Sequence, residues 1–217
     1  DTDLHVAGNT VVPLATTTTG ACYLKMNIGY SCVNNGYFNG KIDDVRLYNR
    51  ALSGAEIAQL YNQGASKFNK TPTNILTNGL VGHWTFDGKN VVNGVALDSS
   101  PNGNNGNLIN ISTSTFYSIG KIGQGFNFDG TNDYINMGDA AALDFGTGDF
   151  TISAWIKTTV AKTQFIVSKR GASANVGYDF RLTSNAGTDN LGLYLRDADD
   201  VSQTVYSGTA AVFDDGN

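Results

Sequence analysis

The sequence predicts an all-β protein, an antiparallel jelly-roll sandwich with one short helix. Of its 217 residues, 26 are Gly and only 3 are Pro, and clusters of Gly, Asn, Ser and Thr separate short alternating runs. Turn signals at this spacing are typical of sandwiches and jelly rolls. Charged residues make up 15% of the chain. Because an average globular protein has roughly 25%, this composition argues against a helical bundle or a coiled coil.

Alternating apolar and polar residues predict the strands of the first part of the chain. Residues 4–14 fit one or two strands, residues 23–29 fit one strand, and residues 42–48 fit another. A period of two divides residues 42–48 between two faces of the strand. One face holds Asp43, Val45 and Leu47, and the other holds Ile42, Asp44, Arg46 and Tyr48.

The period then changes to that of a helix. Ser53 and Glu56 form a capping box, in which each side chain can bond the backbone amide of the other. Ile57 and Leu60 follow at helical spacing, and Gly64 ends the helix. Since Glu56 is the only Glu in the chain, the sequence assigns that Glu a structural role.

A polar linker over residues 64–78 separates this part from a second all-β stretch that begins at Gly79. The strands expected there are 80–87, 126–128, 150–157, 164–169, 176–182 and 191–196. Alternation with Phe86 places Trp84 in the core. Trp155 falls on the face opposite Ile152 and Ile156, where it is either covered by another layer or exposed.

Charge and apolar content argue against two kinds of partner, and the two cysteines raise the question of a disulfide. The formal net charge is −5, so a nucleic-acid partner is not expected. The apolar runs are too short for membrane insertion. Cys22 and Cys32 flank the strand expected at 23–29, so they can pair only if a flanking loop folds back.

Several motifs together resemble one known family. Residues 40–53 resemble the closing strand and helix of laminin-G-like jelly-roll domains, which belong to the concanavalin A-like lectin/glucanase superfamily. Residues 80–87, 123–130 and 149–157 resemble the opening part of the same domain. The closing part therefore comes first and the opening part second. This order indicates a segment of a longer tandem array, with the end of one domain in residues 1–63, a linker in 64–78 and the start of a second domain in 79–217.

The two partial domains are complementary, which suggests a further structural hypothesis. They could close on each other as a circularly permuted composite, because the family places its first and last strands side by side. That hypothesis requires residues 42–48 to pair with residues 80–86. The competing picture is two separate fragments with open sheet edges, which would be prone to aggregate.

The sequence argues against an enzyme. Glycoside hydrolases of the resembled superfamily carry paired glutamates on one strand, and hydrolysis needs two carboxylates on either side of the bond. This chain has one Glu, and its adjacent Asp43 and Asp44 should point to opposite faces of a strand. No Ser/His/Asp or Cys/His constellation is readable, because the only histidines are His5 and His83.

The resemblance also implies a structural Ca²⁺ ion near the rim of the sandwich. Calcium prefers carboxylate and carbonyl oxygens presented by loops. The candidate ligands are Asp87, Asp98, Asn102 and Asp44. The alternative is that Asp98 and Asn102 cap a turn through side-chain-to-backbone bonds, and that Asp44 pairs with a neighbouring cation.

A sugar site would combine exposed aromatic rings with loop Asn and Asp side chains. The candidates are Tyr30, Asn34, Asn35, Tyr37 and Trp155, with Tyr134 and Tyr178 as further aromatic candidates. The resemblance to lectin-like domains implies a non-catalytic, secreted or cell-surface module for adhesion or carbohydrate binding, with glycans or surface proteins as partners. The alternative function is a spacer or protein-interaction repeat in a large surface protein.

Overall fold

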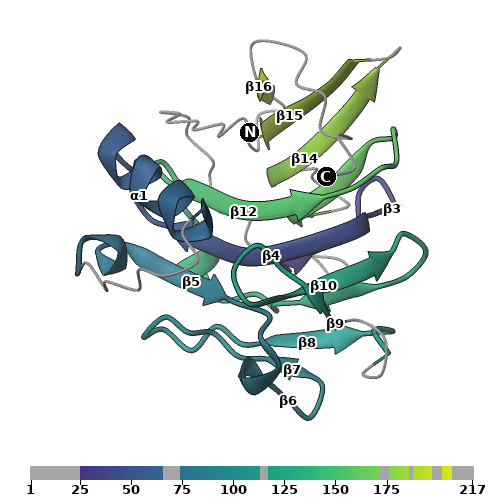
Figure 1. Ribbon diagram of the computed structural model, residues 1–217. Helices are drawn as coiled ribbons and strands as arrows, with labels where there is room; N and C mark the ends of the chain where they lie inside the picture. The colour runs from purple at the N-terminus through teal and green to yellow at the C-terminus, as the bar shows by residue number, and fades with distance from the viewer. Residues whose placement is uncertain are drawn as a thin grey trace.

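The computed structural model describes residues 25–65, 74–112, 117–171, 176–185, 188–196 and 202–206, which form a two-sheet β-sandwich (Figure 1). One antiparallel sheet has nine strands among these residues, in the order β16-β15-β14-β13-β1-β11-β8-β7-β6. Their bounds are Ser202–Tyr206, Thr188–Arg196, Gly177–Asn185, Gln164–Arg170, Asn27–Ile28, Tyr134–Asn136, Gly106–Ile109, Val95–Ala96 and Val91–Val92. The predicted all-β jelly-roll class is confirmed.

The second sheet has five strands within the described residues. Four of them lie in the order β12-β4-β10-β9, with the bounds Thr151–Lys157, Asn39–Tyr48, Gln124–Asp129 and Tyr117–Ile119. The fifth strand, β5, Leu80–Trp84, pairs with β4. Side chains from both sheets form one core, which includes Ile28, Val167 and Phe180 from the larger sheet and Val45, Trp84 and Phe126 from the smaller. Trp84 is fully buried, as its alternation predicted.

Strand β4 joins the two parts of the chain into one sheet. It pairs with β12 along one edge and with β10 and β5 along the other (Figure 1). In the contact with β5, Val45 lies opposite Trp84 and Leu47 lies opposite Gly82. This is the pairing that a closed composite requires. The assignment of residues 1–63 and 79–217 to two successive domains of an array stays a prediction.

The helix predicted from the capping box is present as α1, Gly54–Ala65. The Ser53 amide donates to Glu56 Oε2 at 2.9 Å, and Arg50 forms an ion pair with Glu56 at 2.6 Å. Within the expected 64–78 linker, which stays a prediction, Asn74–Thr77 form the 3-10 helix η1. Leu76 of η1 is buried in a small second cluster with Tyr48 and Leu60. Two further 3-10 helices are η2, Gly88–Asn90, and η3, Ala141–Leu143.

The strand expected over residues 23–29 is shorter and ends at a glycine. Gly29 has φ +85°, and a Cβ atom there would lie 2.6 Å from the Phe128 ring. The chain therefore leaves β1 and enters a small hairpin made of β2, Tyr30–Ser31, and β3, Gly36–Tyr37. Cys32 in this hairpin is disulfide-bonded. Cys22 and the strands expected at 4–14 lie outside the described residues.

A β-bulge corrects the predicted faces of residues 42–48. Asp43 lies opposite Trp155 and Arg46 lies opposite Ser153, so β4 has one more residue than β12 between these pairs. Asp44 at the bulge has φ +50°. Because of this extra residue, Ile42 faces the core together with Val45 and Leu47. Asp43 and Asp44 both lie on the outer face, contrary to the strict alternation expected from sequence.

Candidate functional site

Three tyrosine rings come together on the surface of the larger sheet. Tyr30 and Tyr37 are opposite each other in the β2–β3 hairpin, and their rings stack with centroids 4.5 Å apart and planes 22° apart. Tyr134 of β11 lies 4.9 Å from the Tyr30 ring and 6.5 Å from the Tyr37 ring. All three are partly exposed. We call Tyr30, Tyr37 and Tyr134 the tyrosine cluster.

The hairpin is held flat against the sheet, which fixes the position of its two tyrosines. Asn35 has φ +47° and is the last residue of the turn, directly before Gly36 of β3. A Cβ atom on Gly36 would lie 2.5 Å from the Phe165 ring of β13, so glycine allows the hairpin to approach the sheet closely. The Phe38 amide also bonds the Gly29 carbonyl at 2.9 Å, which closes the base of the hairpin.

Two hydroxyls of the tyrosine cluster are protonated at neutral pH. Burial and the neighbouring Tyr37 raise the pKa of Tyr30 to about 12, and burial also raises the pKa of Tyr134. The hydroxyls of Tyr30 and Tyr134 can therefore both donate and accept hydrogen bonds. The Tyr30 hydroxyl already lies 3.5 Å from Asn35 Oδ1. The cluster thus offers neutral aromatic faces edged by hydroxyls and an amide.

The structure brings most of the predicted sugar-site residues to this hairpin. Asn34 and Asn35 are exposed at its tip, beside Tyr30 and Tyr37. Trp155 lies on the other sheet, where the ring of Tyr61 from α1 is 5.7 Å from its ring and Lys121 Nζ is 5.0 Å from it. Trp155 therefore lies between the two alternatives, because α1 covers part of its ring and the residue stays partly exposed.

Two further aromatic candidates have opposite outcomes. Tyr134 joins the tyrosine cluster. Tyr178 is buried in the core, where its hydroxyl donates to the Leu143 carbonyl at 3.2 Å. Tyr178 therefore cannot present its ring to a ligand.

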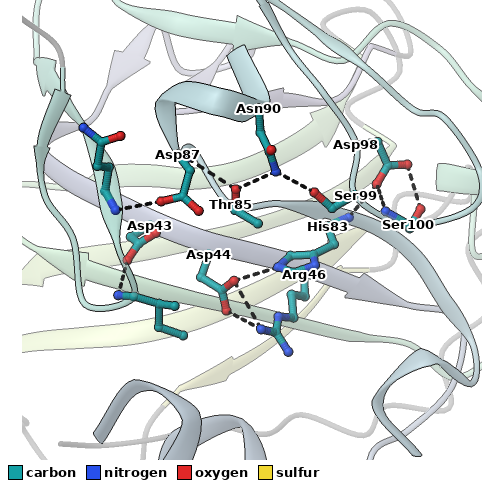
Figure 2. A network of polar contacts seen from close by, with 12 residues as sticks. Asp43, Asp44, Arg46, His83, Thr85, Asp87, Asn90, Asp98, Ser99 and Ser100 are labelled. Atoms are coloured by element: carbon teal, nitrogen blue, oxygen red, sulfur yellow. Dashed lines mark hydrogen bonds and ion pairs between the residues drawn. The ribbon is translucent and has the colours of Figure 1, made fainter. Parts of the chain in front are cut away.

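A second polar site lies on the outer face of the smaller sheet (Figure 2). Asp44 accepts from His83 Nε2 at 2.6 Å and pairs with Arg46 at 2.9 Å. Although burial acts to raise the pKa of Asp44, the hydrogen bond from His83 and the charge of Arg46 lower it overall. Asp44 is therefore an ionised carboxylate held between two cationic or donor groups.

Asp43 has the opposite electrostatic environment to its neighbour. Its Oδ2 accepts from the Ile122 amide at 2.8 Å, and its Oδ1 is buried with no hydrogen-bond partner in the described part of the chain. Burial, with a smaller contribution from the negative charge of Asp44, raises the pKa of Asp43 to about 7. The two adjacent aspartates therefore differ in charge at slightly acidic pH. Because both lie on one face, their adjacency is no argument against a carboxylate pair.

Comparison with known protein families finds one family model that matches the chain. A family model of laminin-G-like domains, described as the concanavalin A-like lectin/glucanases superfamily, matches residues 4–58 and 129–217. These two segments make up about two thirds of the sequence.

The chain belongs to this superfamily. Its laminin-G-like domains are in general non-catalytic, whereas the superfamily as a whole also includes glucanases. No curated protein and no solved structure matches the chain. No helix in the described residues has the length and apolar character that a bilayer-spanning helix needs.

The four predicted calcium ligands of this superfamily member are engaged with protein groups. Asp98 accepts from the amides of His83, Ser100 and Asn104 at 2.8–2.9 Å. Asn102 donates to the Leu80 carbonyl at 2.9 Å, and Asp87 Oδ1 accepts from the Gln124 amide at 2.9 Å. Asp44 is bound to Arg46, whose charge would repel a metal ion.

These contacts do not form a shared calcium site. Over the residues the structure describes, no three or more His, Cys, Asp or Glu side chains gather as a group that could hold a metal. The bonds of Asp98 and Asn102 to the backbone fit the turn-capping alternative. Calcium binding therefore stays a prediction for measurement.

Sequence reasoning missed a third polar group, on the outer face of the larger sheet. Asp179 of β14 pairs with Arg170 of β13 at 2.6 Å, and Arg181 Nη1 lies 4.0 Å from the same Asp179 oxygen. The signal was present as an alternation in residues 178–182, where Asp179 and Arg181 share the face opposite the apolar residues. The contact of both arginines with the Tyr194 ring could not be predicted, because it depends on the register between strands.

Proposed function

We propose that this chain is a non-catalytic carbohydrate-binding or adhesion module whose glycan site is the tyrosine cluster. The observation that carries the proposal is the convergence of Tyr30, Tyr37 and Tyr134 from β2, β3 and β11 into one partly exposed aromatic patch. Membership of a superfamily that contains lectins agrees with it. Fold membership alone would be weaker support, since one fold serves many functions.

The chemistry of the patch suits a sugar ring. Aromatic faces pack against the C–H faces of pyranose rings, while phenol hydroxyls and amides bond their hydroxyl groups. The stacked Tyr30 and Tyr37 rings are already ordered, so little side-chain entropy is lost on binding. Asn34 and Asn35 at the hairpin tip are exposed and can supply polar contacts.

The environments of Glu56, Asp43 and Asp44 favour a binding role over hydrolysis. Glu56 is bound to Arg50 and Ser53 at the start of α1. Asp43 and Asp44 are both buried, at 3% and 5% exposure, so neither is placed to flank a glycosidic bond. A secreted or cell-surface location and a place in a tandem array are part of the proposal. A spacer or protein-interaction repeat is the alternative.

Isothermal titration calorimetry against neutral oligosaccharides tests this function, with and without millimolar calcium. The wild-type chain, Tyr37→Ala and Tyr37→Phe are compared, because Phe keeps the stacked ring and loses only the hydroxyl. Ile119→Ala is the control, since Ile119 is 86% exposed on β9. Circular dichroism establishes that each variant is folded.

We expect saturable binding by the wild-type chain and by the Ile119 variant. Tyr37→Ala should weaken binding by about tenfold or more, a loss of about 1.4 kcal/mol or more in binding free energy. Tyr37→Phe should retain most of the affinity. The glycan site would be refuted if the wild-type chain bound no sugar, or if Tyr37→Ala bound as tightly as wild type. Either result would favour the alternative function of a spacer or protein-interaction repeat.

A further inference from the structure

Two rings of the tyrosine cluster are held together by the hairpin that carries them. Tyr30 of β2 and Tyr37 of β3 are register partners, and their ring centroids lie 4.5 Å apart with planes 22° apart. Tyr134 is farther away, at 4.9 Å from the Tyr30 ring and 6.5 Å from the Tyr37 ring. The closest contact between two phenol rings in the cluster is therefore the one within the hairpin.

Backbone bonds at the base of the hairpin keep these two rings from separating. The Gly29 amide donates to the Ile166 carbonyl of β13 at 2.9 Å, and the Phe38 amide donates to the Gly29 carbonyl at 2.9 Å. Phe38 directly follows Tyr37 and is fully buried. Cys32 in the turn is disulfide-bonded. Both strands of the hairpin are thus anchored, and the two tyrosines are in contact without a ligand.

The hydroxyl ends of the two rings are near neighbours. Burial raises the pKa of Tyr30 to about 12, with further contributions from the charge of the Tyr37 phenol and from a hydrogen bond to it. Both contributions depend on a short distance between the two phenol groups. The ortho carbons, which adjoin the hydroxyl-bearing carbon of each ring, therefore lie at the same end of the stacked pair.

This pair has the properties that oxidative coupling of phenols requires. Both rings are partly exposed, so an oxidant in solution can reach them. One-electron oxidation of a phenol gives a phenoxyl radical whose unpaired electron is shared with the ortho carbons. Two such radicals held in contact react within one molecule, which is far faster than an encounter between molecules. The disulfide at Cys32 agrees with an oxidising environment.

We infer that Tyr30 and Tyr37 are a site of oxidative cross-linking, at which hydrogen peroxide and a haem peroxidase join the two rings by a carbon–carbon bond. Each phenol gives up one electron and one proton, and the peroxide that accepts them becomes two molecules of water. The two phenoxyl radicals couple at their ortho carbons, and each ring becomes aromatic again when its ortho hydrogen moves to the phenol oxygen. The product keeps both hydroxyls and has two hydrogen atoms fewer. The bond ties β2 to β3 and involves no sugar, so this inference goes beyond the proposed function.

Mass spectrometry after treatment with a haem peroxidase and hydrogen peroxide tests the site. The whole chain is treated at low micromolar concentration, then reduced and digested with trypsin. Cleavage after lysines leaves Tyr30 and Tyr37 together in the peptide 26–41, whereas Tyr134 lies in the peptide 122–157. A bond between Tyr30 and Tyr37 removes two hydrogen masses from the peptide 26–41 and prevents its separation into fragments between the two tyrosines.

Two single substitutions show whether the pair itself reacts. Tyr37→Phe keeps the stacked ring and lacks the hydroxyl that forms a phenoxyl radical, and Tyr206→Phe is the matched control, since Tyr206 is 48% exposed on β16. Circular dichroism establishes that both variants are folded. We expect the cross-linked peptide 26–41 in wild type and in Tyr206→Phe, in a fraction that does not change on dilution. In Tyr37→Phe the cross-linked fraction should fall about tenfold or more.

The inference would be overturned if the peptide 26–41 stayed unmodified under conditions that couple free tyrosine. A main bond from Tyr30 to Tyr134, cross-linked dimers as the main product, or an unchanged yield in Tyr37→Phe would overturn it equally. None of these results depends on sugar binding, so the calorimetric test of the proposed function is decided separately.

Discussion

Replacing Asp43 with Asn should change how the stability of the chain depends on pH. Asp43 is 3% exposed, its Oδ1 has no hydrogen-bond partner within the described residues, and its pKa is raised from 3.8 to about 7. The folded chain therefore binds this proton more tightly than the unfolded chain. Its contribution to stability is fully present below the unfolded pKa near 3.8 and is lost as the pH rises through 7.

The size of the effect follows from the shift in pKa. A difference of about three pH units corresponds to about 4 kcal/mol. Because the unfolded carboxyl is already mostly ionised at pH 5, about 2.5 kcal/mol of this change falls between pH 5 and pH 8. Structural relaxation and water penetration reduce the penalty of a buried charge, so we expect about 1–2 kcal/mol.

Urea unfolding of the wild-type chain and Asp43→Asn at intervals from pH 5 to pH 8 measures this change. The variant should gain about 1–2 kcal/mol relative to wild type as the pH rises across this range. Asp149→Asn is the control, since Asp149 is exposed before β12. The burial argument would be refuted if the difference in unfolding free energy between the two proteins stayed constant with pH. It would also be refuted if Asp43→Asn lost stability relative to wild type between pH 5 and pH 8.

Three further predictions concern other parts of the molecule. Gly177→Ala should destabilise the fold by about 3 kcal/mol or more in chemical denaturation, because φ is +124° and the new Cβ would collide with the Lys169 carbonyl oxygen; Gly94→Ala, with φ +76° and open space around it, should cost only about 1–2 kcal/mol. Glu56→Gln should cost about 1 kcal/mol at pH 7. Because Arg50 and Ser53 lower the pKa of Glu56 to about 2, that cost should disappear as the pH falls from 4.5 toward 2, and a cost that persists there would contradict the capping argument. If the chain binds calcium, its melting temperature should rise when millimolar calcium replaces a chelator, and the Asp87→Asn variant should show no such rise. A wild-type melting temperature that does not change with calcium would refute the calcium site.

Local signals in the sequence were sufficient to predict the helix and the longest strands, such as β4, β14 and β15. The capping box of Ser53 and Glu56 depends on residues three apart, and it appears in the structure as predicted. Alternation likewise placed Trp84 in the core. Both signals are set by the chain's own period and need no knowledge of distant neighbours.

Features that depend on backbone irregularity were not predictable from the pattern. The bulge at Asp44 needs a left-handed φ of +50°, which Asp adopts only occasionally, and one extra residue there moved Asp43 to the outer face beside Asp44. Gly29 ended the strand over 23–29 because its neighbour in space is the Phe128 ring, about one hundred residues away in sequence. The tyrosine cluster depends in the same way on register, which brought Tyr134 to Tyr30.

NMR of the isotope-labelled chain shows directly whether a sugar binds at the tyrosine cluster. The aromatic ¹H–¹³C signals are followed while the tightest-binding oligosaccharide of the calorimetry panel is added. We expect saturable shifts of the Tyr30, Tyr37 and Tyr134 ring signals, with those of buried Tyr178 and of Tyr61 beside Trp155 unchanged. Saturable shifts centred on Tyr61 and Trp155, or no saturable shift at the tyrosine cluster, would contradict it.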